Sequence, residues 1–467
     1  MNNILKISLF LLLSLIFSAV LRAQDGELSE KFKEETIERL SELMNERYVF
    51  PEVAEKTSAH LQKQLKAGHF KEFKDVSSFA EALTESVQYI NKDKHMRIRP
   101  NPPYKAPENS PERMIEERLD MINRSRAMTA GFFKAEKMEG NVGYLDLRGF
   151  ASVQRGAPVA DNYMKLLSTS DAIIIDLRQN GGGDPEMVQY LCSFFFDERV
   201  HLNSLYWRQG DRTTDFWTLD KVNGEKMPEV PLFVLTSNRT FSAAEEFSYN
   251  MQSRKRATLI GQTTGGGANP GQMVRINKEL GVFIPTGRAI NPITKTNWEG
   301  VGVIPEVKVS PEKTLEKAHE LAKEAADEFR SRKNAEYKLA LQGLFKALNS
   351  HSDKSSGNEI EKRIKMGKKL GLLTENEING LGYEYLMREK KPKVAEVIFR
   401  TNTKLYPKSA NVYDSYGEAL AMNGKLEASI KSYQKAVELA EKNEDGNLGL
   451  FRENLANVKK QLAKSNE

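Results

Sequence analysis

The sequence predicts an α/β core that lies between two helical regions. Between residues 138 and 310, short β-branched runs that are apolar on both faces alternate with segments of helical periodicity. Before residue 100 the apolar residues recur at helical spacing, and after residue 311 the chain is helical and highly charged. These observations predict the fold class: an N-terminal helical domain, a mixed α/β core and an all-helical C-terminal region.

Residues 1–23 are typical of a signal peptide. Lys6 precedes an apolar run over residues 7–17, and small residues follow up to Ala23. The run is short for a spanning helix. We expect cleavage after Ala23, with Ala19 as the second choice, and therefore an exported, periplasmic or secreted protein without a transmembrane segment in the mature chain. An uncleaved N-terminal anchor is the alternative.

The composition excludes several other classes of protein. The net charge of +5 is small and the charges are interspersed, so no nucleic-acid partner is expected. Cys192 is the single cysteine, which excludes an intrachain disulfide, and its apolar neighbours favour a buried structural role. No clustered His, Cys or Asp set has ligand spacing, so we predict neither a metal nor an organic cofactor.

The N-terminal helical domain is expected over residues 27–99, with a break between two helices at residues 48–51 (YVFP). Residues 100–137 begin with a Pro-rich polar stretch and are interpreted as a linker.

The core, residues 138–310, is predicted to hold a parallel sheet with helices packed on it. We expect strands at residues 142–147, 172–177 and 231–237, helices at 185–196 and 243–251, and shorter strands at 258–261, 272–276 and 282–285.

A helical connector is expected over residues 311–375, followed by repeats over residues 376–467. Small and aromatic residues recur there 34 positions apart, which is the tetratricopeptide period. The matched pairs are Ala395 and Ser429, Phe399 and Tyr433, and Leu405 and Leu439. At the close helix contact the second repeat has Gly417, whereas the first has Tyr383. The pattern predicts a tetratricopeptide-like tail that could bind a protein partner; an unrelated helical bundle is the alternative.

Two short motifs in the core are candidates for chemistry. Ser242 follows a buried strand and begins a helix, so its hydroxyl is either an ordinary N-cap or a nucleophile beside the Ala243 amide. Residues 180–183 (NGGG) follow another buried strand. Consecutive glycines let backbone amides approach a ligand, so this loop is a tight turn, a phosphate cradle or an oxyanion hole.

Four segments in order resemble the C-terminal processing (tail-specific) serine peptidases: residues 175–183 (IDLRQNGGG), 235–245 (LTSNRTFSAAE), 259–264 (LIGQTT) and 298–305 (WEGVGVIP). The resemblance implies a crotonase/ClpP-like β-α core. The helical start, with YVFP and Asp93-Lys94-His95, is similar to the branch that contains the tricorn protease core and the interphotoreceptor retinoid-binding protein repeats.

The resemblance also implies the reaction. Better-known members use a serine–lysine dyad, but this chain has Gly267 where the lysine would stand. The tricorn-like branch implies Ser242 as nucleophile, His95 as base and Glu299 as the orienting carboxylate. In tricorn protease a serine stands where this chain has Lys94.

These residues predict acyl transfer from a peptide or protein substrate to water. The oxyanion donors are expected among the amides of Gly182, Gly183 and Ala243. An unperturbed histidine base predicts that activity rises with pH through about 6.5. The alternative is a catalytically inactive ligand- or peptide-binding module of the same fold. Asp176 and Arg178 are expected to pair within their loop, and Glu245 and Glu246 to favour the helix N-terminus.

Overall fold

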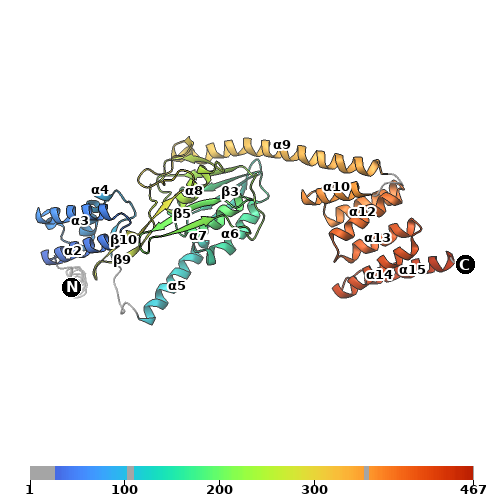
Figure 1. Cartoon of the computed structure of the whole chain (residues 1–467), viewed down its shortest axis with the longest axis horizontal. Coiled ribbons are helices and arrows are strands. Elements are labelled where there is room, and N and C mark those ends of the chain that lie inside the picture. The colour runs from blue at the N-terminus through green and yellow to red at the C-terminus, as the bar shows by residue number, and fades with distance from the viewer. Residues whose placement is uncertain (1–26, 102–109, 352–356, 466–467) are drawn as a thin grey trace, which may run out of the picture. The chain divides into compact units, whose positions relative to one another are not determined.

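The structure, a computed structural model, describes residues 27–101, 110–351 and 357–465. The predicted signal peptide therefore lies outside the described residues. The chain divides into two compact units, one up to Phe329 and one from Arg330 onward (Figure 1).

The first unit is built on a six-stranded sheet in the order β12-β8-β7-β4-β3-β2. Neighbours from β3 to β12 pair in parallel, and β2 is an antiparallel edge strand. The parallel α/β core expected from the sequence is confirmed, and its carboxyl strand ends meet at one edge, where such sheets place their sites. The strand bounds are β2 (Phe132–Met138), β3 (Val142–Leu147), β4 (Ala172–Asp176), β7 (Leu232–Thr236), β8 (Thr258–Gly261) and β12 (Val307–Lys308).

Helices cover both faces of this sheet (Figure 1). One face packs against α6 (Val153–Leu167), α7 (Pro185–Cys192) and α8 (Ala243–Ser253). The other packs against the start of α9 (Thr314–Asn349), whose Ala318, Ala322 and Ala326 recur every fourth residue. Because both faces are covered, successive side chains along the central strands β4 and β7 are buried and mostly apolar. A 3-10 turn (Ser193–Phe195) follows α7, and Cys192 is fully buried as expected.

The N-terminal helices do not form a core by themselves. The helices α2 (Glu30–Arg47), α3 (Pro51–Lys66) and α4 (Val76–Asn91) pack on a second sheet in the order β1-β10-β9. The boundary drawn at residue 99 therefore needs correction, because β9 and β10 come from the core segment and share one apolar cluster with the helices. The strand bounds are β1 (Ile98–Pro100), β9 (Gly271–Arg275) and β10 (Leu280–Pro285), and a 3-10 turn (His69–Glu72) lies between α3 and α4.

The predicted linker over residues 100–137 is wrong for its described second half. Ser110 caps the charged helix α5 (Pro111–Ala127), and a 3-10 turn (Thr129–Gly131) leads into β2 of the main sheet. The prolines of this segment suggested a linker, but Pro111 is the first residue of α5, a position where proline is tolerated.

A third sheet, in the order β11-β5-β6, was not predicted. Its strands are β5 (His201–Trp207), β6 (Arg212–Trp217) and β11 (Gly287–Ile290).

The second unit is helical throughout its described residues. Its helices are the second part of α9, α10 (Asn358–Lys369), α11 (Glu375–Tyr383) with a π-helical turn η5 (Glu384–Arg388), α12 (Pro392–Leu405), α13 (Ala410–Met422), α14 (Leu426–Asn443) and α15 (Leu448–Ser465). Residues from α9 and α10, such as Leu348 and Ile364, share a core with α11 and α12. The expected connector is therefore divided, with its start in the first unit and its remainder in the second.

Two glycines in this unit make the same kind of close contact with an aromatic ring. A Cβ at Gly382 would lie 2.4 Å from the Phe399 ring, and one at Gly417 would lie 3.0 Å from the Tyr433 ring. The small residue of the first repeat is thus Gly382 and not Tyr383. The tetratricopeptide interpretation stays a prediction.

Candidate active site

Ser242 sits in a strained turn between β7 and α8. Its backbone has φ 56° and ψ −122°, whereas an ordinary N-cap residue is extended. A non-glycine residue at positive φ is held there only by its surroundings, and such strain gathers at functional sites. A strand-to-helix turn of this kind projects a serine hydroxyl above the sheet. The conformation favours the nucleophile over the plain N-cap.

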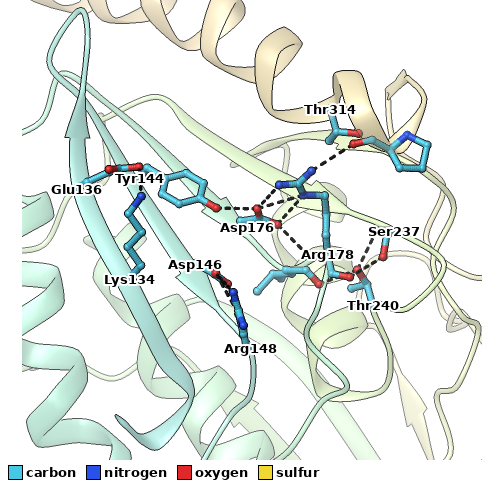
Figure 2. Close-up of polar contacts among 12 residues, drawn as sticks. Lys134, Glu136, Tyr144, Asp146, Arg148, Asp176, Arg178, Ser237, Thr240 and Thr314 are labelled. Carbon is cyan, nitrogen blue, oxygen red and sulfur yellow. Dashed lines mark hydrogen bonds and ion pairs between the residues drawn. The ribbon is translucent and has the colours of Figure 1, made fainter. Parts of the chain in front are cut away.

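The turn before Ser242 is tied to the glycine loop that follows β4. The Ser237 hydroxyl donates to the Arg178 carbonyl at 2.6 Å, and the Thr240 hydroxyl donates to the Leu177 carbonyl at 2.8 Å (Figure 2). The Phe241 amide donates to the Asn180 carbonyl at 3.0 Å. These bonds fix the two loops relative to each other.

The glycine loop is held in turn by the expected pairing of Asp176 and Arg178. The Arg178 guanidinium forms a two-point pair with the Asp176 carboxylate, with Nη2–Oδ2 at 2.6 Å and Nε–Oδ1 at 3.0 Å (Figure 2). The Tyr144 hydroxyl also donates to Asp176, at 2.8 Å. This pairing confirms the sequence prediction, and two-point arginine–carboxylate pairs are among the stronger hydrogen-bonded pairs.

The three amides expected to hold an oxyanion are not equivalent. A Cβ at Gly182 would lie 2.8 Å from the Ser242 Cβ, so only glycine lets this loop reach the serine. The Gly182 amide, however, already donates to the Asn180 side chain at 2.9 Å. Among the described residues, the amides of Gly183 and Ala243 have no hydrogen-bond partner. These two residues and Ser242 line one small cavity of about 50 Å³.

Glu245 has a larger structural part than the sequence analysis gave it. Its buried carboxylate accepts hydrogen bonds from the amides of Ser242, Gly266 and Gly267, at 2.6–2.9 Å, and from the Thr264 hydroxyl. Burial raises the pKa of this carboxyl group. Glu245 thus joins the nucleophile turn to the loop after β8. The Ser-x-x-Glu capping-box spacing was the available signal.

His95 and Glu299, distant in sequence, lie close together. One ligand atom from each of Asp93, His95 and Glu299 lies within 4.8 Å of the other two. His95 Nδ1 and Glu299 Oε1 are both buried and have no hydrogen-bond partner. The other oxygen of Glu299 accepts from the Ala268 amide at 2.5 Å. No hydrogen bond joins Ser242 to His95 among the described side chains, a separation that sites without substrate often show.

Asp93 is a site residue that the sequence analysis named without assigning it a role. Its carboxylate is buried and accepts from the Tyr48 hydroxyl at 3.2 Å, the Asn269 side chain at 2.9 Å and the His95 amide at 3.0 Å. Burial raises the pKa of Asp93 although these bonds favour its charged form. The Tyr48-Val-Phe-Pro motif, first interpreted as a helix break, therefore supplies a support for the His95 segment.

The Asp93, His95 and Glu299 donors could also hold a divalent cation, since carboxylate and imidazole ligands suit Zn²⁺. The sequence analysis predicted no metal, because these ligands come from segments about 200 residues apart.

Gly267 explains why a lysine base has no room here. A Cβ at this position would lie 2.2 Å from Cζ of Phe241 and 2.6 Å from Cε1 of His95. The His95 ring packs on Phe241 with ring centroids 4.5 Å apart. The imidazole therefore fills the space beside the position where dyad enzymes carry their lysine.

This packing predicts the effect of Gly267→Ala. The added methyl must displace the rings of Phe241 and His95, and a shift of about 1 Å in a catalytic group costs about 10²-fold in rate. We expect kcat to fall by about 10² with a normal circular dichroism spectrum. Gly181→Ala is the control, because a Cβ there meets no atom within 4 Å. Equal activity of both variants would contradict the placement of His95.

Burial also changes the expected pH dependence. Burial, assisted by the charge of Arg97, lowers the pKa of His95 to about 4. A rise in activity near pH 6.5 is therefore no longer expected. Burial and the Asp93 charge raise the pKa of Glu299 to about 8. Below that pH Glu299 is protonated and carries no negative charge with which to stabilise the His95 imidazolium. Activity should therefore rise as pH increases through about 8.

The measurement is kcat/KM on one peptide from pH 5 to 10. Glu299→Gln removes the ionisable group and should abolish the rise near pH 8. A midpoint near 6.5 that persists in Glu299→Gln would contradict this assignment.

Comparison with known proteins finds one family along the first part of the chain. Residues 141–309 match the model of Peptidase family S41, and residues 27–134 match the N-terminal domain of S41 peptidases in eukaryotic IRBP. A carboxy-terminal-processing protease of Bartonella bacilliformis is 25% identical over 186 residues, which is 38% of this chain and 41% of that protein. The chain thus spans under half the length of this curated relative.

Two solved structures align with this chain at low identity. The photosystem II D1 C-terminal processing protease aligns with a TM-score of 0.38 and 16% identity, over 61% of this chain and 94% of that one. The tricorn protease aligns with a TM-score of 0.38 and 14% identity, over 64% of this chain and 37% of that one. Both family models match in order along the chain, so this chain is similar to peptidase family S41 over residues 27–134 and 141–309.

Proposed function

We propose that this chain is a serine peptidase that hydrolyses peptide bonds through an acyl-enzyme. The observation that carries the proposal is the strained Ser242 turn, which lies beside the unpartnered amides of Gly183 and Ala243. A nucleophile next to two free donors is the arrangement that acyl transfer requires. The match of residues 141–309 to peptidase family S41 supports the same reaction.

In the proposed reaction the Ser242 oxygen attacks the peptide carbonyl carbon while His95 takes the hydroxyl proton. The Glu299 carboxylate would accept a hydrogen bond from Nδ1–H of His95 and stabilise the imidazolium, without taking its proton. The carbonyl oxygen becomes an oxyanion held by the Gly183 and Ala243 amides. The C–N bond then breaks as His95 returns the proton to the leaving amine, and water releases the acyl group by the same steps.

The proposal is tested by digesting a mixed peptide library with the wild type and with Ser242→Ala, followed by mass spectrometry. Cleavage by the wild type alone supports Ser242 as the nucleophile and gives the specificity. Equal cleavage by both proteins contradicts it.

An inactive peptide-binding module of the same fold is the second candidate. The buried, unsatisfied His95 Nδ1 and Glu299 Oε1 argue against it, because a binder gains nothing from burying polar atoms without partners. Retention of library peptides without any cleavage, at pH 7 and at pH 9, would favour this candidate.

We also propose that the chain is exported, on the strength of the signal-peptide pattern in residues 1–23. Within the residues that the structure describes, no helix is long and apolar enough to cross a membrane. N-terminal sequencing of the protein from a cell fraction should find Gln24 first.

The helical unit from residue 330 onward is proposed to bind a protein partner, because its two glycine–aromatic contacts repeat as in peptide-binding repeats. Removal of residues 330–467 should leave peptide cleavage unchanged and abolish the capture of a partner. A cut at residue 376 is less suitable, since it would expose Leu348 and Ile364.

A further inference from the structure

Helix α5 carries an apolar stripe that the described residues of its own unit leave uncovered. None of the side chains that the structure describes in α5 is buried, and Figure 1 shows the helix extending away from the main sheet of the first unit. Apolar residues nevertheless recur every three or four positions along one side of it. We call this the α5 stripe. It consists of Met114 (65% exposed), Ile115 (58%), Leu119 (52%), Met121 (41%) and the half-buried Ile122.

A helix with such a stripe is expected to have a packing partner. Isolated helices of about 12–15 residues are marginal in water, and α5 has only 17 residues. The Ser110 hydroxyl caps the helix, and ion pairs join Arg113 to Glu117 and Asp120 to Arg124. These contacts favour the helix but cover no apolar surface. Since most of the stability of a helix in a protein comes from burying its apolar face, the stripe indicates an apolar surface that covers it.

The charges of α5 indicate what that surface is. Residues 111–117 contain three acids and one arginine, whereas residues 118–127 contain three arginines and one acid. A second copy of α5 laid antiparallel would set the acidic half of each helix against the basic half of the other, and a parallel copy would bring like charges together. A surface that is complementary to its own reverse suits a two-fold symmetric contact between identical chains.

The antiparallel arrangement also has a defined register. Glu112 and Arg126 each lie seven residues from Leu119, and seven residues is close to two helical turns. The three side chains therefore follow one edge of the stripe. With Leu119 on the two-fold axis, it lies opposite the partner's Leu119, and Glu112 lies opposite the partner's Arg126. The pairs Met114 with Met121 and Ile115 with Ile122 repeat at the same spacing, as in paired helices.

We propose that the protein forms a two-fold dimer through antiparallel pairing of the α5 stripes. This inference is independent of the proposed peptidase activity. A helix of this length is about 25 Å long, so the contact is small for a protein interface. We therefore expect a weak dimer, with a Kd of about 10 µM.

The test measures the mass of the protein from Gln24 onward by light scattering, and its Kd by sedimentation equilibrium, at concentrations on both sides of that value. Leu119→Glu places two carboxylates against each other at the axis and should raise the Kd at least about 100-fold. Leu339→Glu is the control, because Leu339 is another exposed leucine but lies on α9, and it should keep the wild-type Kd. Circular dichroism checks that both variants are folded.

A charge exchange tests the register. Arg126→Glu should weaken the dimer about tenfold, because it sets acid against acid at both ends of the contact. The double variant Glu112→Arg/Arg126→Glu should restore the wild-type Kd, since each pair forms again with its signs reversed. An effect on the helix dipole alone would instead make the double variant worse than the single one.

Three results would each overturn the inference. The first is a wild type that stays monomeric at all concentrations, which would mean that something other than a second copy covers the stripe. The second is a Kd that Leu119→Glu leaves unchanged. The third is a double charge variant that associates no better than Arg126→Glu.

Discussion

Ser242→Ala and His95→Ala are each expected to lower kcat by about 10⁴–10⁶-fold, and the double variant should be no worse than either single one. A nucleophile and its base act as one unit, so loss of either removes the covalent route. The activity that remains would come from substrate binding and from the amides of Gly183 and Ala243, which stay in place.

The measurement is kcat on a peptide identified in the library digest. His201→Ala is a matched control, because His201 also contacts a serine, with Nε2 3.0 Å from Ser204 Oγ, yet has no proposed part in the reaction. It should keep kcat within about a factor of three. If the losses in Ser242→Ala and His95→Ala multiply in the double variant, the two residues act independently and the proposed mechanism is wrong.

Glu245→Ala should lower the free energy of unfolding of the peptidase unit by at least about 3 kcal/mol. The substitution leaves the buried amides of Ser242, Gly266 and Gly267 without an acceptor, at about 1–3 kcal/mol for each buried unpaired donor. The nucleophile turn and the loop that carries Gly267 would also separate. We therefore expect a further loss of kcat of about 10² or more.

Urea denaturation followed by tryptophan fluorescence isolates this effect, because Trp207, Trp217 and Trp298 all lie before residue 330. Glu186→Ala is the matched control, since Glu186 is an exposed acid in the first turn of α7. A helix-dipole effect alone is worth about 0.3–1 kcal/mol. If both substitutions cost the same, Glu245 acts only on the helix dipole, as the sequence analysis first suggested.

The sequence by itself determined the α/β core, since runs such as residues 172–175 are apolar on both faces and favour a buried parallel strand. It also determined the candidate residues, because the four motifs carry Ser242, Glu299 and the glycine loop in a specific order. The pairing of Asp176 with Arg178 followed from their proximity in the chain. These are local properties, readable from neighbouring residues.

Only the tertiary structure decided how distant segments combine. The β1-β10-β9 sheet joins the N-terminal helices to the core, and no periodicity within residues 27–99 could indicate that partner. The side chains of Asp93, His95 and Glu299 lie close together although about 200 residues separate them in the chain. Their burial there moves the pH at which activity is expected to rise from about 6.5 toward 8. Gly267 stands where the dyad enzymes carry a lysine. Because glycine has no side chain, the His95 ring can occupy the space beside it. Burial and contact depend on the folded chain as a whole, so residue types and spacing could name these groups but could not set their pKa values or their partners.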